Sequence, residues 1–268
     1  MPIIAPDHSD RSLADLFRFD GRVAVVTGAA RGLGARIVER LAEAGATIVA
    51  GDLDADGARR SAAQAAERWG VAAVGSHLDV ADPASIEAIA DLAVERFDRL
   101  DVWVNNAGIS SATGPATDVD PDFLDTMFAV NARGTYLGAR EAAKRMPDGG
   151  AVVNVLSTTG FRASAGISAY VASKHAAVGA TKALGLEFAP LGVRVLGVAP
   201  TVIDTPGVQA ELAPLRDAGV DIDARIAGNP LGRVGVPDDV ARVVVFAASD
   251  LAAFMTGSTL AVDAGRLA

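Results

Sequence analysis

Short apolar runs alternate along this chain with longer, alanine-rich stretches in which apolar residues recur at a helical period. Valine and other residues that favour strands dominate the short runs, whereas the long stretches repeat their apolar positions every three or four residues. The pattern predicts strands at residues 22–28, 47–52, 72–80, 101–108, 151–157, 193–200 and 258–265. It predicts helices that begin near Leu33, Ala55, Pro83, Pro121, Ser168 and Pro237.

This alternation predicts an α/β fold in which a mainly parallel, seven-stranded sheet is covered by helices on both faces. No linker rich in proline, glycine or serine interrupts the series. We therefore expect one doubly wound domain over residues 21–268.

Two segments fall outside the regular alternation. Residues 1–20 are an expected extension that ends in a short docking helix. Three apolar residues would dock that helix: Leu13, Leu16 and Phe17. Residues 206–229 are long for a connection, so we expect a substrate lid there, with a helix around residues 208–215.

Composition narrows the classes of function. Half of the residues are hydrophobic and 21% are charged, which is typical of a compact globular chain. The formal net charge of -9 disfavours binding to the phosphates of nucleic acids, which depends on clustered lysine and arginine. The sequence has no cysteine, which excludes disulfides, thiolate metal sites and cysteine nucleophiles.

The sequence shows no sign of targeting to a membrane. It lacks a basic segment followed by an apolar one at its start, and no apolar run reaches the roughly 18 residues of a membrane span. We therefore expect a cytoplasmic protein without a membrane partner. His8, His77 and His175 are scattered, so no metal site is expected, and the lack of a Gly-x-Ser-x-Gly motif argues against a serine hydrolase.

A glycine-rich turn follows the first predicted strand, where residues 27–34 read TGAARGLG and a helix opens. Glycines let the backbone turn tightly and approach a pyrophosphate, whose charge the N–H groups at the helix start would hold. Ordinary loops and close packing also use glycines. The turn alone therefore leaves a phosphate site and a structural turn as alternatives.

The second predicted strand ends at Asp52, 18 residues beyond Gly34. An acid at that point accepts hydrogen bonds from the adenosine ribose and repels a 2′-phosphate, which favours NAD over NADP. Arg31 in the glycine turn is a possible partner for that phosphate, but Leu53 rather than a second base follows Asp52. We expect NAD; the alternative is that Asp52 is a solvated acid at a strand end.

Tyr170 and Lys174 are four residues apart on a predicted helix, so their side chains project from one face. An unperturbed tyrosine has a pKa near 10. A positive charge at roughly 4 Å, with an effective dielectric constant of about 20, favours the phenolate by roughly 4 kcal/mol. Tyr170 would then exchange protons near neutral pH, although this spacing is also common on solvated helices.

Hydroxyl groups precede that helix. Ser157 ends a predicted strand 13 residues before Tyr170, and strand ends hold ligands in doubly wound sheets. Thr158 and Thr159 offer neighbouring hydroxyls, and spacing alone does not choose among the three.

A polar residue also interrupts the helix expected over residues 121–146. Asn131, with Gly134 close by, is a poor helix former in an otherwise alanine- and leucine-rich stretch. This predicts a kink or a buried polar role, against the alternative of a solvated face.

Together these features resemble the short-chain dehydrogenase/reductase family, in its non-extended branch of about 250 residues. The resemblance covers about residues 18–268. It implies a Rossmann-type domain and a hydride transfer between NAD(H) and a secondary alcohol or ketone. Its markers are TGAARGLG (27–34), Asp52, LDV (78–80), NNAG (105–108), Asn131, Ser157, YVASK (170–174) and APTVIDTP (199–206).

The resemblance also implies roles for these positions. The tyrosine matching Tyr170 exchanges a proton with the substrate oxygen, and the lysine matching Lys174 supports it and holds the nicotinamide ribose. The serine matching Ser157 polarises that oxygen, and the asparagine matching Asn131 holds a water of a proton relay. The implied cofactor-binding set is Gly28, Arg31, Gly32, Leu33, Gly34, Asp52, Leu53, Asp79, Val80, Asn106, Ala107, Gly108, Tyr170, Lys174, Pro200, Val202 and Thr205.

Two positions depart from the family pattern. Thr201 replaces a glycine and Leu156 replaces a frequent serine, and both bear on the fit of the pocket more than on proton transfer. The substrate itself is not readable from the sequence. Phe161 favours a hydrophobic alcohol or ketone, whereas Arg162 either binds an acidic group or faces water.

The C-terminal segment bears on assembly. The C-terminal DAGRLA resembles a segment that packs at subunit interfaces, which implies a homotetramer. The main alternative function is a non-catalytic dinucleotide-binding scaffold or sensor of the same fold, which would commonly lack the tyrosine or the lysine. A dinucleotide-dependent epimerase or dehydratase is disfavoured by the length of 268 residues.

Overall fold

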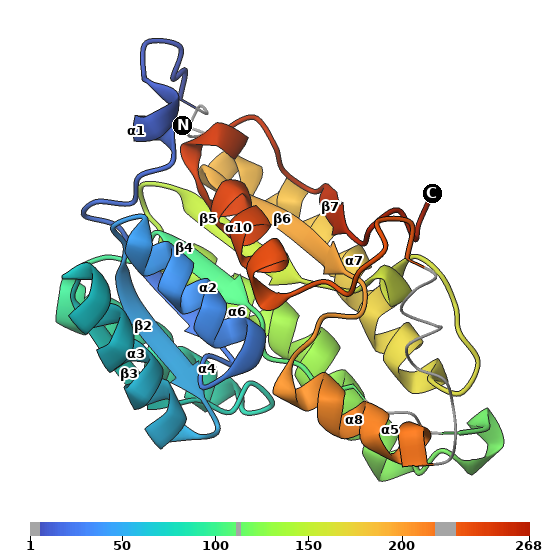
Figure 1. Ribbon diagram of the computed structural model, residues 1–268. Helices are drawn as coiled ribbons and strands as arrows, with labels where there is room; N and C mark the ends of the chain where they lie inside the picture. The colour runs from blue at the N-terminus through green and yellow to red at the C-terminus, as the bar shows by residue number, and fades with distance from the viewer. Residues whose placement is uncertain (1–5, 111–113, 218–228) are drawn as a thin grey trace.

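A single seven-stranded sheet forms the centre of the protein (Figure 1). The computed structural model describes residues 6–110, 114–217 and 229–268. The strand order is β3-β2-β1-β4-β5-β6-β7, and every described pair of neighbours is parallel. The predicted parallel sheet is therefore confirmed. The strands are β1 (Val23–Thr27), β2 (Thr47–Asp52), β3 (Ala73–His77), β4 (Val102–Asn105), β5 (Gly150–Val155), β6 (Val193–Pro200) and β7 (Thr259–Val262).

Helices cover both faces of the sheet (Figure 1). One face carries α2 (Gly32–Glu43), α3 (Ala55–Trp69) and α10 (Pro237–Ala248), and the other carries α4 (Pro83–Phe97), α6 (Thr135–Lys144) and α7 (Ser168–Glu187). In β1, Ala24 and Val26 pack into the core beneath α2, α3 and α10, whereas Val23 and Val25 pack into the core beneath α4, α6 and α7. Because successive residues of a strand point to opposite faces, a strand buried on both sides becomes a continuous apolar run.

The helix expected over residues 121–146 is not continuous. It consists of α5 (Pro121–Phe128), a π-helical segment η2 (Ala129–Gly134) and α6. Asn131 and Gly134 are both buried in the π-helical segment, which is the interruption that their poor helix propensity predicted. At Gly134 the backbone comes so close to residue 80 that an added Cβ would lie 2.7 Å from the Val80 carbonyl oxygen.

The N-terminal segment is attached differently from the expectation. Helix α1 (Leu13–Leu16) buries Leu16, but Leu13 is 73% exposed and Phe17 is 40% exposed, so the expectation of docking through all three is wrong. Arg11 of this segment pairs with Asp250. Phe19, which is fully buried and donates its N–H to the Ala44 carbonyl at 2.8 Å, also attaches the segment.

The remaining elements are short or incompletely described. Helix α8 (Pro206–Asp217) confirms a helix at the start of the expected lid, while residues 218–228 of that lid and residues 1–5 lie outside the described residues. The 3-10 turns are η1 (Ala116–Asp118), η3 (Thr158–Gly160), η4 (Ala189–Leu191) and η5 (Asp250–Ala252). Among the described helices, none combines the length and the apolar character that crossing a membrane requires.

Candidate active site

The predicted site residues converge at one edge of the sheet. β1 ends at Thr27, β2 at Asp52, β4 at Asn105 and β6 at Pro200, and each of these ends precedes a group of predicted residues. Parallel strands place their carboxyl ends side by side, so these loops become neighbours although they are far apart in the sequence. Helix α7 and the π-helical segment η2 add the remaining groups.

The glycine turn is tightly folded and leaves the start of α2 open. Gly28 has φ +66°, and an added Cβ there would lie 2.8 Å from the Ala107 Cα. A Cβ at Gly34 would lie 1.9 Å from the Gly28 carbonyl oxygen, so only glycine fits. Arg31 at the N-cap of α2 makes no side-chain capping bond. The cradle and the uncapped helix start fit a pyrophosphate.

Loops after β1 and β4 are bonded to each other. The side-chain amide nitrogen of Asn106 donates to the backbone carbonyl oxygens of Thr27 and Gly28 at 2.9 and 3.1 Å. The Thr27 hydroxyl accepts from the backbone N–H groups of Asn106 and Ala107 at 3.0 and 2.9 Å. Thr27 is part of the TGAARGLG marker but was not among the expected site residues; its signal is a hydroxyl at the buried end of a strand. On the other side of the turn, Thr205 faces Gly32, where an added Cβ would lie 3.6 Å from the Thr205 Cβ.

Asp52 holds a fixed negative charge beside the glycine turn. One carboxylate oxygen accepts from the Ala30 N–H and the other from the Asp54 N–H, both at 2.9 Å. Leu53 is 66% exposed next to it. Arg31 is exposed and forms no ion pair with any other described residue. The structure therefore places one fixed acid and one unpaired base around this corner of the site.

The LDV segment follows β3 rather than belonging to it, since β3 ends at His77. Its position beside β2 is fixed by a backbone bond from the Leu78 N–H to the Asp52 carbonyl at 2.9 Å. The Asp79 carboxylate accepts from the Ala81 N–H at 2.8 Å, and Val80 is buried. The predicted strand over 72–80 is thus too long, because its last residues form the turn into α4.

Lys174 is the most distinctive group of the site. Its side chain is buried, its ammonium donates to the Val155 carbonyl at 3.1 Å, and it lies 5.8 Å from the centroid of the half-buried Tyr170 ring. An added Cβ at Gly108 would lie 3.6 Å from the ammonium and 3.1 Å from the Asn131 side-chain oxygen. Burial lowers the pKa of Lys174 to about 8, so most molecules still carry this charge at neutral pH.

Asn131 connects this group to the loop after β4. Its side-chain oxygen accepts from the Ile109 N–H at 2.9 Å, and its amide donates to the Ile109 carbonyl at 2.8 Å and to the Ser173 hydroxyl at 3.1 Å. Ser173 in turn donates to the Tyr170 carbonyl at 2.9 Å. Asn131 therefore has the buried polar role that was expected as one alternative. Ser173 belongs to the YVASK marker, but no role was expected for it.

Ser157 lies just beyond β5 and is 8% exposed. Its hydroxyl oxygen accepts from the Thr159 N–H at 3.2 Å and contacts the Thr159 hydroxyl at 2.8 Å. The turn η3, which follows Ser157, packs closely on α7 at Gly160, since an added Cβ there would lie 3.0 Å from the Lys174 carbonyl oxygen. The strand end with Ser157 and the helix with Tyr170 and Lys174 are thus packed together.

The two departures from the family pattern lie in different surroundings. Leu156 is buried against Ala177 and Ala199, in a small core between α7 and β6. Thr201 follows Pro200 at the end of β6 and donates its N–H to the Val262 carbonyl at 3.2 Å. Val202 is 39% exposed beside it.

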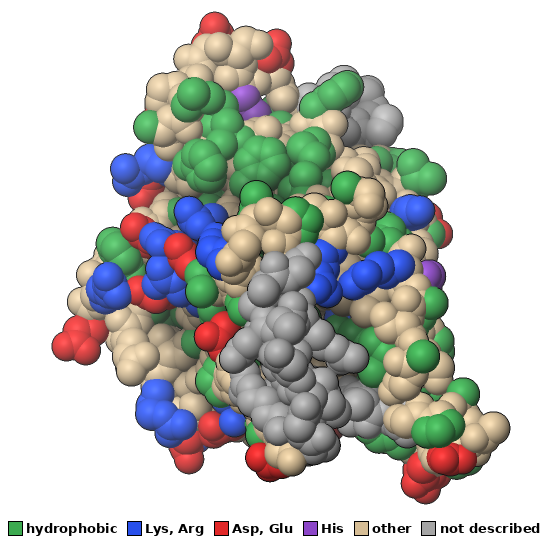
Figure 2. Space-filling view, turned by 45° about the vertical axis from the view of Figure 1, so that its right-hand side comes forward, with side chains coloured by type: hydrophobic (Ala, Val, Ile, Leu, Met, Phe, Trp, Pro, Cys, Tyr) green, Lys and Arg blue, Asp and Glu red, His purple; other side chains and the backbone are tan. Residues whose placement is uncertain are grey.

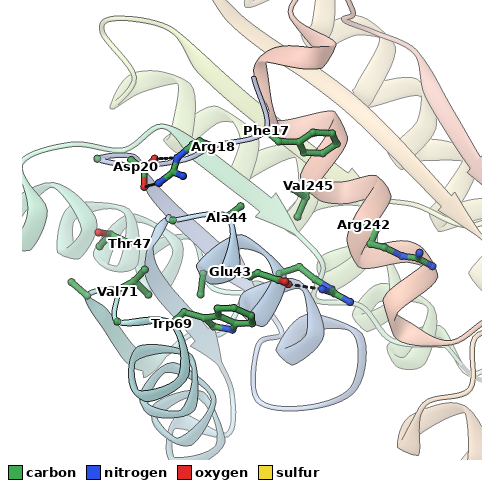
Figure 3. Close-up of a pocket in the computed structure, with 16 residues that line it drawn as sticks. Phe17, Arg18, Asp20, Glu43, Ala44, Thr47, Trp69, Val71, Arg242 and Val245 are labelled. Atoms are coloured by element: carbon green, nitrogen blue, oxygen red, sulfur yellow. Dashed lines mark hydrogen bonds and ion pairs between the residues drawn. The ribbon is translucent and has the colours of Figure 1, made fainter. Parts of the chain in front are cut away.

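A separate hollow of about 730 Å³ lies at the opposite end of the strands (Figure 3). Thr47, the first residue of β2, lines it together with Trp69 at the end of α3. Arg18 pairs there with Asp20, and Arg40 pairs with Glu43. Because these charges are paired and none of the predicted site residues lines the hollow, it is not the candidate active site.

On the face shown in Figure 2, surface charge gives no competing site. Basic and acidic side chains are interspersed on the face in Figure 2, with no continuous basic stripe. Within the described ranges, no group of three or more histidine, aspartate or glutamate side chains is placed to hold a metal ion.

Comparison with known proteins places this geometry in a wider context. A family model described as Enoyl-(Acyl carrier protein) reductase matches residues 28–266. The D-threitol dehydrogenase of Mycolicibacterium smegmatis is 42% identical over 251 residues, covering 93% of this chain and 94% of that protein. The 4-formylbenzenesulfonate dehydrogenase TsaC1/TsaC2 of Comamonas testosteroni is 40% identical, covering 91% of this chain and 97% of that protein. The crystal structure of levodione reductase is 33% identical with a TM-score of 0.89, covering 93% of this chain and 98% of that one.

Proposed function

Because the chain belongs to the short-chain dehydrogenase/reductase family, whose members are oxidoreductases, we propose that it transfers a hydride between NAD(H) and a secondary alcohol or ketone. The observation that carries this proposal is the buried, charged Lys174 beside Tyr170, at the strand ends where the glycine turn also lies. Such a cation is costly to bury, which argues for a chemical role.

The residues at the strand ends fit a dinucleotide. Gly28 and Gly34 form a cradle that any side chain would fill, and the open start of α2 offers N–H groups to a pyrophosphate. Asp52 would accept bonds from the adenosine ribose, while Lys174 would hold the nicotinamide ribose. Bound nicotinamide would supply the hydride acceptor or donor.

Side chains of the protein, and not the cofactor, would transfer the proton. We assign Tyr170 as the group that exchanges a proton with the substrate oxygen, with the positive charge of Lys174 favouring the phenolate. Ser157 would donate a hydrogen bond to that oxygen as its negative charge develops. Asn131 would position this arrangement through its bonds to Ile109 and Ser173.

The direct test is a panel of secondary alcohols and ketones, followed by nicotinamide absorbance with NAD and with NADP. It would include D-threitol and levodione, together with the aldehyde 4-formylbenzenesulfonate as a compound outside those two classes, because relatives are named for them. We expect turnover of at least one compound. A protein that binds NAD but turns over no member of a broad panel would instead support the scaffold or sensor alternative.

The first variant addresses the choice of cofactor. Replacing Asp52 with serine removes the fixed charge, and Arg31 stays available as a partner for a 2′-phosphate. The ratio of kcat/KM for NAD over NADP should therefore fall by at least about tenfold. Steady-state kinetics with both cofactors and one substrate measure it.

Asp54→Asn is the matched control for that variant. It removes a negative charge two residues away while keeping a side chain able to cap α3, where Asp54 accepts from the Gly57 N–H at 2.9 Å. The control should keep the wild-type cofactor ratio. If the wild type already prefers NADP, or if Asp52→Ser leaves the ratio unchanged, Asp52 does not determine the choice.

We also propose that the chain assembles as a homotetramer. Phe254 is 100% exposed and Leu186 is 75% exposed, and Thr256 connects their segments by donating to the Gly185 carbonyl at 3.2 Å. Exposed apolar groups of this size are typical of contact surfaces. Light scattering should give four times the chain mass of 27.2 kDa, and Phe254→Ser should lower it. A monomer in wild-type solutions would contradict the proposal.

A further inference from the structure

We propose that Thr159 is a positioning residue that directs the Ser157 hydroxyl toward the substrate oxygen, an inference that rests on the proposed function. Thr159 is in the 3-10 turn η3, two residues beyond Ser157. Its backbone N–H donates to the Ser157 hydroxyl oxygen at 3.2 Å, and its own hydroxyl lies 2.8 Å from the same oxygen. Thr159 thus reaches Ser157 with two groups.

Counting donors and acceptors fixes the direction of the second bond. A serine hydroxyl has one proton and two lone pairs, and the Thr159 N–H occupies one lone pair. If the Thr159 hydroxyl accepted a bond, Ser157 would have no proton left for the substrate. With substrate bound, the Thr159 hydroxyl therefore donates to Ser157, and Ser157 donates to the substrate oxygen.

This chain of hydroxyls has two consequences. Both lone pairs of Ser157 are filled, so Ser157 acts as a donor and leaves proton exchange to Tyr170. Successive hydrogen bonds also polarise one another, which makes the Ser157 proton a stronger donor to an oxygen that gains negative charge. The effect of Thr159 therefore increases as the reaction proceeds and belongs to kcat more than to KM.

The turn that carries Thr159 is held firmly against the catalytic helix. The Gly160 N–H donates to the Ser157 carbonyl at 2.9 Å. An added Cβ at Gly160 would lie 2.8 Å from a methyl carbon of Val178 and 3.0 Å from the Lys174 carbonyl, so the turn and α7 are in direct contact. Thr159 is thereby placed at a fixed position relative to Tyr170.

The test compares Thr159→Val with Thr159→Ser. Valine keeps a similar shape without the hydroxyl, so kcat should fall about tenfold while KM stays within about twofold. Serine restores the hydroxyl and should bring kcat back to within about threefold of wild type. Thr158→Val, the same exchange at a residue whose hydroxyl shows no bond to Ser157 among the described contacts, should lose far less. NAD affinity and Tm should be unchanged in Thr159→Val.

A double-mutant cycle separates action through Ser157 from action on the substrate or the fold. In a Ser157→Ala background, Thr159→Val should change kcat by less than about twofold. The inference is overturned if Thr159→Val alone has no effect, if serine does not rescue it, or if the full loss persists in the Ser157→Ala background. If Ser157→Ala itself keeps wild-type turnover, the proposed role of Ser157 fails; if only Thr159→Val keeps it, the proposed function stands and this inference alone fails.

Discussion

Replacing Tyr170 with phenylalanine should lower kcat by about a hundredfold to ten-thousandfold, which is the usual contribution of a positioned general acid or base. Phenylalanine keeps the ring that lies 5.8 Å from the Lys174 ammonium and removes only the hydroxyl. NAD affinity should therefore stay close to that of the wild type. Steady-state kinetics together with a binding titration separate the two effects.

The sequence supplies a matched control for that variant. Tyr136 is the second of the two tyrosines in the chain, and it is 43% exposed on α6. Tyr136→Phe removes the same oxygen atom away from the site and should leave kcat within about twofold of the wild type. A Tyr170→Phe enzyme that turns over as fast as the Tyr136→Phe control would contradict the assignment of the proton exchange.

Lys174→Met should also remove most of the turnover, and unlike Tyr170→Phe it should weaken NAD binding. The variant loses the positive charge beside Tyr170 and the proposed contact with the nicotinamide ribose. Lys182→Met, an exposed lysine on the same helix, is the control. Kinetics and NAD titration of the two variants provide the comparison, and equal NAD affinity in both would contradict the contact with the ribose.

The same variant makes an opposite prediction for stability. Burial lowers the pKa of Lys174 to about 8 from its usual 10.5, so between those values the unfolded chain binds more protons than the folded one. The cost of this buried charge is complete below pH 8 and disappears as the pH rises toward 10.5. Lys174→Met should therefore raise the free energy of unfolding by on the order of 2 kcal/mol at pH 7, allowing for the lost bond to Val155.

Thermal unfolding of the protein without cofactor, recorded from pH 7 to pH 10.5, checks this expectation. The Tm advantage of Lys174→Met over the wild type should shrink as the pH rises. A less stable variant at pH 7 would mean that the ammonium is satisfied by its surroundings despite its burial. Loss of activity combined with a gain in stability would show that Lys174 serves the chemistry rather than the fold.

Much of the architecture follows from local pattern. The strand β1 is buried at every position and apolar at all but its last, Thr27, because both of its faces are covered, and this distinguishes a buried parallel strand from a surface one. The glycine turn and the Tyr170–Lys174 spacing are equally local. The interruption at Asn131 was foreseeable from helix propensity, but neither its π-helical form nor the close approach of Gly134 to Val80 was.

Contacts between distant segments were the part that the pattern did not reveal. Leu13 has the periodicity of a docking residue, yet the N-terminal segment is attached through Phe19 and the Arg11–Asp250 ion pair, and Leu13 stays exposed. Thr27 and Ser173 carry hydrogen bonds that join separate loops, and a hydroxyl in a sequence gives no indication of its partner. The bond between the Thr159 and Ser157 hydroxyls likewise has no signal in the sequence.

Isotope labelling tests the proposed hydride transfer because it follows the hydrogen from the substrate to the cofactor. The alcohol with the fastest turnover in the panel would be deuterated at its carbinol carbon and incubated with the enzyme and NAD, and the reduced nicotinamide would be analysed by mass spectrometry. Each reduced nicotinamide should carry one deuterium, and Tyr170→Phe should form it far more slowly than the wild type. Ketone formation without deuterium in the cofactor would contradict the proposed hydride transfer.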